Sequence, residues 1–367
     1  MTRRIAHLVE LSGGGPTTVA LNYIQGQRAQ GDEVHLIACR NLISEDLKTK
    51  IGTDLLYTSS RNPAQFPRVA KEVAALIDRV APDVLHLHSA FAGVYGRMAL
   101  SHLAVPRPAV VYCSHCWAFN QDVSASKKRV YAAVERHFLS QTDAIINISR
   151  YDSQAAQALG VNCGNDHLIY NGVADAAPGT QAADLGLDPS KINIGFFGRF
   201  DRQKGIDLLL EGFAQAARPE LRLHLIGNTL RGDQDDLHLP AHVTRQDWVS
   251  QDQVDAHMRA FDLIALPSRW EGFSLVALEA MRNSRPLLVS DRCSLPEAVF
   301  DGVNGLVFEL DRPGALSQAL ERLPDLDLAR MGANARMIYE TCFRFETHLA
   351  KVNQVYDDVL AKRADKR

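Results

Sequence analysis

The sequence has no long apolar run, few cysteines and no dominant charge, and each of these absences excludes a class of protein. No apolar stretch in its 367 residues approaches the roughly 20 residues that a bilayer-spanning helix needs. The apolar piece after Arg3 and Arg4 is too short for the core of a signal peptide, and no small-residue cleavage site follows it. Six cysteines at irregular spacings predict reduced thiols and not a disulfide framework. We therefore expect a cytoplasmic protein.

Charge of one sign is also missing. Nucleic-acid binding would need a strongly basic balance with interleaved aromatic residues, and the sequence has neither. The formal net charge is −3, although the two halves differ. The first 170 residues carry 17 Lys and Arg against 14 Asp and Glu, and the remainder carries 23 against 29. A mildly basic first half is suited to meeting an anionic molecule.

Short β-rich runs alternate with amphipathic helical runs, which predicts parallel sheets covered by helices on both faces. The expected strands are 4–9, 33–39, 83–88, 109–114, 144–148, 167–170, 192–197, 221–226, 263–267 and 287–290. The expected helices are 17–29, 65–80, 92–102, 126–139, 151–159, 206–217, 251–259 and 274–282.

The length and a linker at 171–191 favour two domains. We predict an α/β fold of two doubly wound, Rossmann-like domains at 1–170 and 171–344, with a helix at 345–367 that crosses back to the first. Such a pair places a cleft between the carboxyl ends of its sheets, where ligands usually bind.

The segment Gly195–Gly205, "GFFGRFDRQKG", has the features of a diphosphate site. A strand ends at Gly198, and Arg199 and Lys204 flank a polar turn before the next helix. Glycine lets the backbone approach a ligand closely, the cations offset its charge, and the start of a helix offers free N–H groups. The spacing is not that of a Walker A loop, which argues against a kinase or an ATPase. The alternative is a solvated loop with incidental charges.

A second glycine-rich segment, "SGGGP" at Ser12–Pro16, lies between the first strand and the first helix. It can admit an anion or a bulky ligand, or form a tight turn. Its glycines are consecutive, and Thr18 stands where a dinucleotide fingerprint would have its third glycine. The second strand also ends without an acidic residue, so the pattern argues against a nicotinamide dinucleotide site.

The segment 268–281, "SRWEGFSLVALEAM", carries two glutamates around an apolar run. Glu271 falls on a loop after a strand, and Glu279 lies one to two turns into the helix that follows. The loop can turn both carboxylates towards one ligand, with the N–H groups of Phe273–Leu275 holding phosphate between them. A carboxylate can accept two hydrogen bonds from a diol, so Glu279 suits sugar hydroxyls. The alternative for Glu279 is an ordinary surface position on the helix.

Three elements in this order and spacing resemble the retaining nucleotide-sugar glycosyltransferases of family 4 (glycosyl transferases group 1), which have the two-domain GT-B fold. These elements are "GRFDRQKG", "PSRWEGFSLVALEAM" and "VFDGVNGLVFE". The similarity is strong over most of the second half, and it covers the first half through "SGGGP", "YCSHCW" and "IYNGV". Ser284 departs from the family pattern, in which a glycine usually precedes the next strand.

The resemblance implies a retaining transfer of a hexose from a nucleotide sugar, bound by the second domain, to an acceptor on the first, without a metal or another cofactor. Arg199 and Lys204 would hold the donor diphosphate, Glu271 would lie against the donor sugar, and Glu279 would bind the ribose hydroxyls. Family members often place a histidine, here His115, near the C6 hydroxyl of the donor sugar. The predicted catalytic residues are Glu271, His115, Arg199 and Lys204. The predicted donor-binding residues are Gly14, Gly15, Gly198, Arg199, Lys204, Trp248, Glu271, Gly272, Phe273, Ser274, Leu275 and Glu279.

Two segments keep competing interpretations. Trp248, within 246–249, could meet the base of the donor or belong to the core. A second set of side chains resembles zinc ligands: Cys113, His115 and Cys116, with His86 and His88. However, a strand directs neighbouring side chains to opposite faces, and no second Cys pair completes a ligand set. We therefore predict no metal site, and expect His86 and His88 to be buried near the cleft.

The partners are the least specified part of this prediction. The donor is expected to be a UDP-sugar before a GDP-sugar, and the acceptor a glycan or lipid-linked glycan of bacterial surface polysaccharide. The basic amphipathic helix expected at 124–138 can contact an anionic membrane at its inner face or an acceptor diphosphate, or present a solvated face over the core. The alternative functions are a nucleotide-sugar epimerase of the same architecture and a non-catalytic sugar-binding protein.

Overall fold

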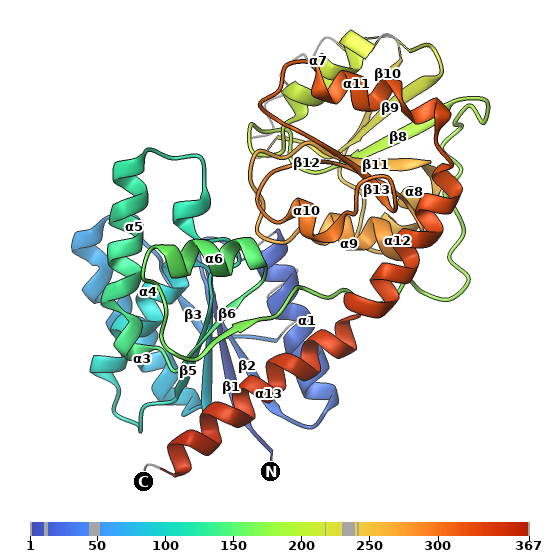
Figure 1. The fold of residues 1–367 in the computed structure, drawn as a ribbon. Coiled ribbons are helices and arrows are strands. Elements are labelled where there is room, and N and C mark those ends of the chain that lie inside the picture. The colour runs from blue at the N-terminus through green and yellow to red at the C-terminus, as the bar shows by residue number, and fades with distance from the viewer. Residues whose placement is uncertain are drawn as a thin grey trace. The chain divides into compact units, whose positions relative to one another are not determined.

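The structure, a computed structural model, describes residues 2–10, 14–43, 52–216, 218–229, 239–240 and 242–365. It divides into two compact units, the first formed by Met1–Asn171 with Thr347–Arg367 and the second by Gly172–Glu346. Each unit is a parallel sheet covered by helices (Figure 1). The predicted fold class, two doubly wound α/β units, is confirmed.

The first unit is built on a sheet in the order β3-β2-β1-β4-β5-β6-β7, all of whose neighbouring strands are parallel. Its strands are β1 (Arg4–Val9), β2 (Glu33–Cys39), β3 (Leu56–Tyr57), β4 (Val84–His88), β5 (Ala109–Cys113), β6 (Ala144–Asn147) and β7 (Asp166–Leu168). The helices described in this unit are α1 (Gly15–Ala29), α3 (Phe66–Val80), α4 (Ala90–Ala99), α5 (Ala125–His137), α6 (Arg150–Ala158) and α13 (Phe345–Ala364).

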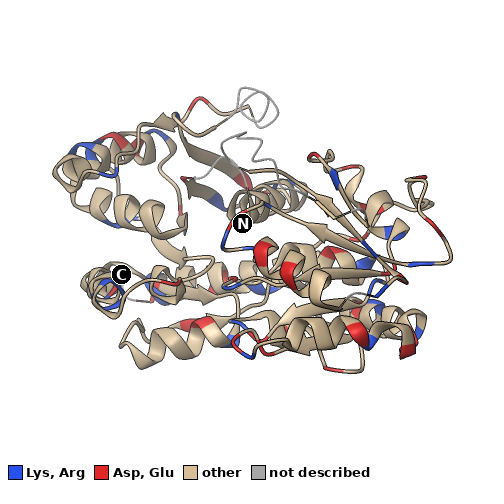
Figure 2. Ribbon diagram, turned by 90° about the horizontal axis from the view of Figure 1, so that it is seen from above, with Lys and Arg blue, Asp and Glu red and all other residues tan. Residues whose placement is uncertain are grey.

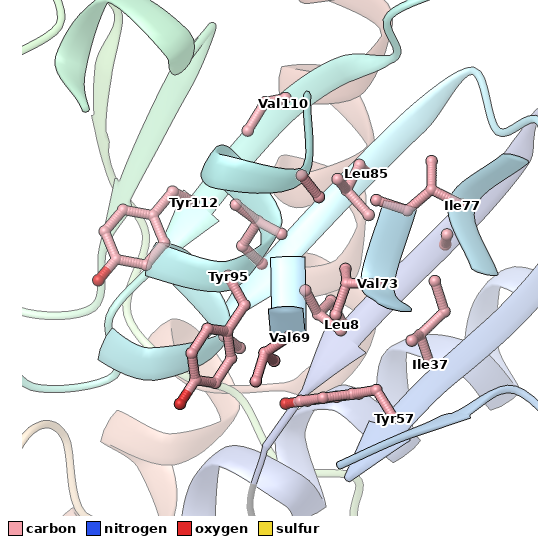
Figure 3. Close-up of a cluster of buried hydrophobic side chains, with 14 of the residues drawn as sticks. Leu8, Ile37, Tyr57, Val69, Val73, Ile77, Leu85, Tyr95, Val110 and Tyr112 are labelled. Carbon is pink, nitrogen blue, oxygen red and sulfur yellow. The ribbon is translucent and has the colours of Figure 1, made fainter. Parts of the chain in front are cut away.

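The two faces of this sheet differ in chemistry because side chains alternate along each strand. On one face, apolar residues of β1, β4 and β5 form one buried cluster with those of α3 (Figure 3). The residues in this cluster include Leu8, Leu85, Val110, Val69, Val73 and Ile77. The opposite face carries the buried imidazoles of His7, His86 and His88. It is covered by α1 and α13, because Tyr23 of α1 stacks against His86 and Tyr356 of α13 meets the same ring edge to face.

A buried ion pair joins α4 to α5 in the first unit. The Arg97 guanidinium donates to Glu135 Oε2 at 2.7 Å and lies 4.2 Å over the ring of Tyr112. The Tyr112 hydroxyl donates to the other oxygen of Glu135 at 3.0 Å. The inner face of α5 is therefore partly charged, while Val130 and Val134 on the same helix are exposed.

The second unit has a sheet in the order β10-β9-β8-β11-β12-β13, again with parallel neighbours. Its strands are β8 (Ile192–Phe197), β9 (Leu221–Ile226), β10 (Val243–Gln246), β11 (Leu263–Leu266), β12 (Leu287–Ser290) and β13 (Gly305–Phe308). Its helices in the described residues are α7 (Ile206–Ala216), α8 (Val254–Ala260), α9 (Leu275–Arg282), α10 (Leu295–Ala298), α11 (Ala315–Glu321) and α12 (Leu328–Cys342). The core of this unit packs α7 and α11 against the sheet.

Three other features bear on the sequence predictions. No disulfide joins any of the six cysteines, all of which lie in the described residues. Among the described residues, no helix combines the length and the apolarity that crossing a bilayer requires. Basic and acidic residues are interspersed along the helices of both units, so the charge difference between the halves is spread over many elements (Figure 2).

Candidate active site

In the second unit, the carboxyl ends of β8 and β9 are followed by Gly198 and Gly227, where the backbone carries no side chain. The Gly198 amide donates to the Ile226 carbonyl at 3.0 Å, which joins the two strand ends. Gly227 has φ +139°, and a Cβ at this position would overlap the carbonyl oxygen of Gly198. Only glycine fits there, so the backbone stays open to a ligand.

The turn after Gly198 is folded around Asp201. Its carboxylate accepts from Arg199 Nε at 2.7 Å and from the Lys204 amide at 3.0 Å. Arg199 also donates to Gln203 Oε1 at 2.7 Å. The guanidinium is therefore aligned before any ligand binds, and the Arg199 side chain keeps a third of its surface exposed.

Lys204 and Glu271 form an ion pair at the same edge of the sheet. Lys204 Nζ donates to Glu271 Oε1 at 2.6 Å, and the Ser268 hydroxyl donates to the same oxygen at 2.8 Å. Ser268 is held in turn, because its carbonyl accepts from the Ser290 hydroxyl at 2.6 Å. Among the described residues, no hydrogen bond to Glu271 Oε2 is present, so the carboxylate has one oxygen for a ligand.

The start of α9 follows directly. Ser274 caps this helix by accepting from the Ala277 amide, and Phe273 is anchored against the ring of Phe343 at 5.4 Å. Gly272 joins this cap to Glu271. The first N–H groups of an α-helix have no partner within the helix, so this end of α9 is suited to an anion.

Glu279 lies within α9 and is buried, with 9% of its surface exposed. Burial raises its pKa, and the nearby Arg282 acts in the opposite direction. Its Oε1 accepts from Gln251 Nε2 at 3.2 Å. The alternative of an ordinary surface position for Glu279 is therefore wrong.

Trp248 follows β10 and is exposed over 55% of its surface. The alternative of a core tryptophan is therefore wrong. Its ring edge approaches Gly227, and the preceding Asp247 accepts from the Asn228 side chain at 2.6 Å. The exposed indole thus stands beside the glycine surface at the end of β9.

In the first unit, Gly14 precedes α1 with φ +79°, and Gly15 is the first residue of that helix. The Gly14 carbonyl accepts from the amide and the hydroxyl of Thr18 at 3.2 and 3.3 Å. A Cβ on Gly14 would meet nothing within 4 Å, so this backbone is open. Ser12 and Gly13 of the same glycine-rich segment lie outside the described residues.

His115 follows β5 with φ +57°, and its ring contacts another histidine. Its Nε2 lies 2.8 Å from His88 Nδ1, and burial lowers its pKa to about 3. Burial also raises the pKa of the neighbouring Cys113 thiol to about 12, so this thiol stays protonated. Within the described residues, the group close enough to share an ion is His7, His86 and His88, and not the alternative zinc set with Cys113 and Cys116 that was considered from the sequence.

The structure thus brings the predicted residues of the second unit to one edge of its sheet, while His115 and Gly14 belong to the first unit. Sequence reasoning missed the residues that hold them, namely Asp201, Gly227, Gln251 and Ser268. Gly227 could have been found, because a glycine directly after a strand in a doubly wound fold is typical of a ligand-facing turn. The three others are common polar residues that only tertiary contact reveals.

Comparison with known families gives two matches that together cover most of the chain. The model for Glycosyltransferase Family 4 matches residues 13–176. The model for Glycosyl transferases group 1 matches residues 179–338. The division between the two matches lies near the division between the two structural units.

Among similar sequences, an uncharacterized 41.2 kDa protein in the cps region of Klebsiella pneumoniae is 29% identical over 314 residues, covering 84% of this chain and 86% of the relative. Among solved structures, sucrose-phosphate synthase from Thermosynechococcus elongatus superposes with a TM-score of 0.81 at 20% identity, over 98% of this chain and 100% of the other. Anabaena HepE in complex with UDP-glucose gives a TM-score of 0.79 at 21% identity, over 97% and 100%.

Proposed function

The chain belongs to the glycosyltransferases that the family 4 and group 1 models describe, and from this premise we propose that it transfers a hexose from a nucleotide sugar to an acceptor hydroxyl with retention at the anomeric carbon. The observation that carries the proposal is the Lys204–Glu271 pair at the carboxyl edge of the second sheet, beside the start of α9. This edge of a doubly wound sheet is where nucleotides bind.

The donor diphosphate would be held by three positive features. Arg199 and Lys204 supply full charges, and the start of α9 supplies N–H groups and the positive end of the helix dipole. Lys204 is already oriented by Glu271, so little ordering is needed when the phosphates arrive. Trp248 offers a flat surface for the base, and Glu279 offers a carboxylate for the ribose hydroxyls.

Glu271 would contact the sugar through the oxygen that its protein partners leave open. In the transfer step, the bond from the anomeric carbon to the leaving phosphate breaks and the acceptor oxygen bonds the same carbon from the same face. The acceptor proton passes to the leaving phosphate oxygen. Arg199, Lys204 and the α9 amides stabilise the negative charge on the phosphate as it develops. Positive charge in this scheme comes from side chains and amides, without a metal or another cofactor.

We propose UDP as the first nucleotide to test and GDP as the second. The support is HepE, a protein of similar fold whose crystal structure contains UDP-glucose. For the acceptor we propose a glycan or lipid-linked glycan of bacterial surface polysaccharide. The support is the Klebsiella relative, which is described by its place in the cps region.

We propose that α5 brings the enzyme to the inner face of a membrane. Val130 on this helix is exposed over 59% of its surface, close to the exposed Lys127 and Arg129. Exposed apolar and basic residues on one helix favour an anionic lipid surface.

Vesicles with anionic lipid should pull down the protein, and the double variant Lys127→Glu/Arg129→Glu should bind less than Lys71→Glu, an exposed charge reversal on α3. Equal binding by the two variants would contradict this role of α5.

A donor screen followed by a turnover assay tests the function. Nucleotide sugars that bind should raise the melting temperature by mass action, which ranks the donors. The best donor is then incubated with glycan acceptors, and the anomeric configuration of the product is read by NMR. A product of retained configuration supports the proposal. An epimer formed from donor alone would establish an epimerase instead, and binding without turnover would establish a sugar-binding protein.

A further inference from the structure

A row of buried imidazoles crosses the sheet of the first unit, one on each of three adjacent strands or strand ends. His7 lies on β1, His88 on β4, and His115 two residues after the end of β5. His7 Nδ1 is 2.9 Å from His88 Nε2, and His88 Nδ1 is 2.8 Å from His115 Nε2. Burial lowers the pKa of all three, so each ring is neutral at physiological pH.

A neutral imidazole has one N–H donor and one acceptor nitrogen. In a row of such rings, the direction of one hydrogen bond therefore fixes the direction of the next. A group at one end of the row can decide which nitrogen carries the proton at the other end. The tautomer of His115 is then set by the group that hydrogen-bonds to His7 Nε2, the nitrogen that does not face His88.

That group is Gln27 of α1. Its Oε1 lies 2.8 Å from His7 Nε2, and its Nε2 donates to Asn353 Oδ1 of α13 at 3.2 Å. Asn353 is itself oriented, because its Nδ2 donates to Gln30 Oε1 at 2.7 Å. Gln27 also hydrogen-bonds to the Tyr356 hydroxyl. The amide nitrogen is thus committed to α13, which turns the carbonyl oxygen towards His7.

The tautomers follow from this orientation. A carbonyl oxygen only accepts, so His7 carries its proton on Nε2 and accepts at Nδ1. His88 must then donate from Nε2 and accept at Nδ1, and His115 must donate from Nε2. We propose that Gln27 is a positioning residue, which through His7 and His88 holds His115 as the Nε2–H tautomer with Nδ1 as a hydrogen-bond acceptor.

The consequence for catalysis rests on the proposed function. An acceptor at Nδ1 can receive a hydrogen bond from a hydroxyl of the donor sugar but cannot donate one. The family resemblance implies that His115 lies near the C6 hydroxyl of the donor sugar. In that role it would select a sugar with this hydroxyl over an analogue in which fluorine replaces it, since fluorine has no proton to donate. The other tautomer would donate from Nδ1, and because a hydroxyl oxygen can also accept, this requirement would be lost.

A shared metal ion is the rival interpretation of these imidazoles. His7, His86 and His88 each bring one candidate ligand atom within 4.8 Å of the others. However, the nitrogens of His7 and His88 that face each other already share a proton at 2.9 Å, and an ion would have to displace it. His86 hydrogen-bonds to the Tyr356 hydroxyl at 2.6 Å through Nδ1, and its Nε2 is without a hydrogen-bond partner among the described residues.

The tautomer is measured on the full chain by NMR of ¹⁵N-labelled histidine, with the His115 signals identified by their loss in His115→Asn. We expect the wild-type spectrum to show His115 protonated at Nε2. In Gln27→Met, which keeps the side-chain length but offers no acceptor, His115 should become a mixture of tautomers. Gln27→Glu keeps an acceptor and should restore the wild-type pattern, and Gln25→Met on the exposed side of α1 should change nothing.

Three results would overturn the proposal. His115 protonated at Nδ1 in the wild type would do so without any variant, which covers the case in which Gln27→Met does not fold. An unchanged tautomer in folded Gln27→Met would show that the row is not directed by Gln27. Stoichiometric shifts of His7, His86 and His88 on adding Zn²⁺ would show a metal site instead.

The activity measurement separates this proposal from the proposed function. Gln27→Met should lower kcat/KM for sugar transfer by about 10-fold, the value of one hydrogen bond, and Gln27→Glu should recover most of it. If the wild type shows the expected tautomer but transfers no sugar from any nucleotide donor, the proposed function fails and the role of Gln27 stands. If transfer is normal but Gln27→Met leaves the tautomer unchanged, only the role of Gln27 fails.

Discussion

Lys204 and Glu271 neutralise each other as an ion pair in the second unit. They are 67 positions apart in the sequence, and the distance of 2.6 Å between Nζ and Oε1 is set by the neighbouring ends of β8 and β11. When a diphosphate binds, it adds negative charge, and the Lys204 ammonium can then interact with both the diphosphate and the Glu271 carboxylate. The pair therefore keeps a largely buried ammonium in place without leaving it unpaired.

Replacing Lys204 with Met should lower kcat/KM for sugar transfer by about 100- to 1,000-fold, because the developing phosphate charge loses a fixed cation. The variant should also melt at a lower temperature, since the buried Glu271 carboxylate loses its partner. Arg202→Met, an exposed change of the same charge in the same turn, is the matched control and should keep its activity. Equal rates for the two variants would remove Lys204 from the site.

Gly227 is the second residue on which the geometry of the site depends, because it has no side chain. Gly227→Ala should force the ends of β8 and β9 apart, because the new Cβ would overlap the Gly198 carbonyl. We expect loss of donor binding in a thermal-shift assay together with a fall in melting temperature. Gly302→Ala is the control, since Gly302 also has a positive φ of +75° but has open space around it. Similar behaviour of the two variants would show that strain alone, and not the close approach, matters at Gly227.

At the scale of elements, α9 combines a ligand-facing start with a buried carboxylate inside the helix. Burial raises the pKa of Glu279, so its charged form destabilises the folded state above that pKa. Structural need does not explain such a group, and buried carboxylates of this kind cluster at functional sites.

Glu279→Gln should therefore raise the free energy of unfolding near neutral pH while weakening donor binding by about 10-fold or more, since it loses a charged acceptor for ribose hydroxyls. Urea denaturation and donor titration measure the two effects separately. Glu211→Gln, on the exposed side of α7, should change neither quantity. A variant that is both more stable and equally good at binding would exclude Glu279 from the donor site.

The contact between α4 and α5 is decided by the buried pair of Arg97 and Glu135. Glu135→Ala should cost about 3–5 kcal/mol of unfolding free energy, because the guanidinium is left buried without its counter-ion. The double variant Arg97→Met/Glu135→Leu should lose much less, since it removes both charges and keeps apolar volume. Arg129→Ala on the exposed face of α5 is the control. Equal losses in Glu135→Ala and in the double variant would contradict this account.

At the scale of the whole molecule, the first unit buries five histidines in the neutral form. Burial lowers the pKa of His7 and His348 to about 4 and that of His115 to about 3, from an ordinary value of 6.5. The pKa values of His86 and His88 are also lowered by burial. The unfolded chain binds protons to these groups below about pH 6.5, whereas the folded unit binds them only at a lower pH.

The first unit should therefore lose stability as the pH falls from about 6.5 to about 4, and its stability should not depend on these histidines above that window. Each group contributes up to about 1.4 kcal/mol per pH unit within its own window, and a domain has only about 5–15 kcal/mol of stability to lose. The buried Trp117 can report this unit once Trp248 and Trp270 of the second unit are replaced by Phe. A urea midpoint that stays constant between about pH 7 and about pH 5 would contradict the prediction.

The sequence predicted the repeating pattern of both units well, but not their edges. Five strands, β1, β2, β8, β9 and β12, have the predicted bounds, because each is a compact apolar run between turn residues. Three strands were missed: β3 has two residues, β10 is the polar edge segment "VTRQ", and β13 lies within the "NGLVFE" motif, which was read as a family signature only. The helices α10, α11 and α12 were also not predicted.

At the site, residue types and order predicted which residues gather at the second sheet's edge, because strand ends in a doubly wound fold share one edge. Which of these side chains would hydrogen-bond to each other could not be predicted from the sequence. That Lys204 bonds Glu271, or that Gln27 orients a row of histidines, depends on the register between strands and on rotamers, which tertiary packing fixes.

The helix α13 supplies Asn353, Tyr356 and His348 to a core whose strands were all specified near the other end of the chain. On a translating ribosome, the nascent first unit would wait for about 175 intervening residues, Gly172–Glu346, before its imidazoles could be covered. The second unit, contiguous in the chain, could fold during that wait. The second unit would then complete its fold before the first. A nonsense codon ahead of α13 would release a chain with a folded second unit and a first unit whose imidazoles are not covered.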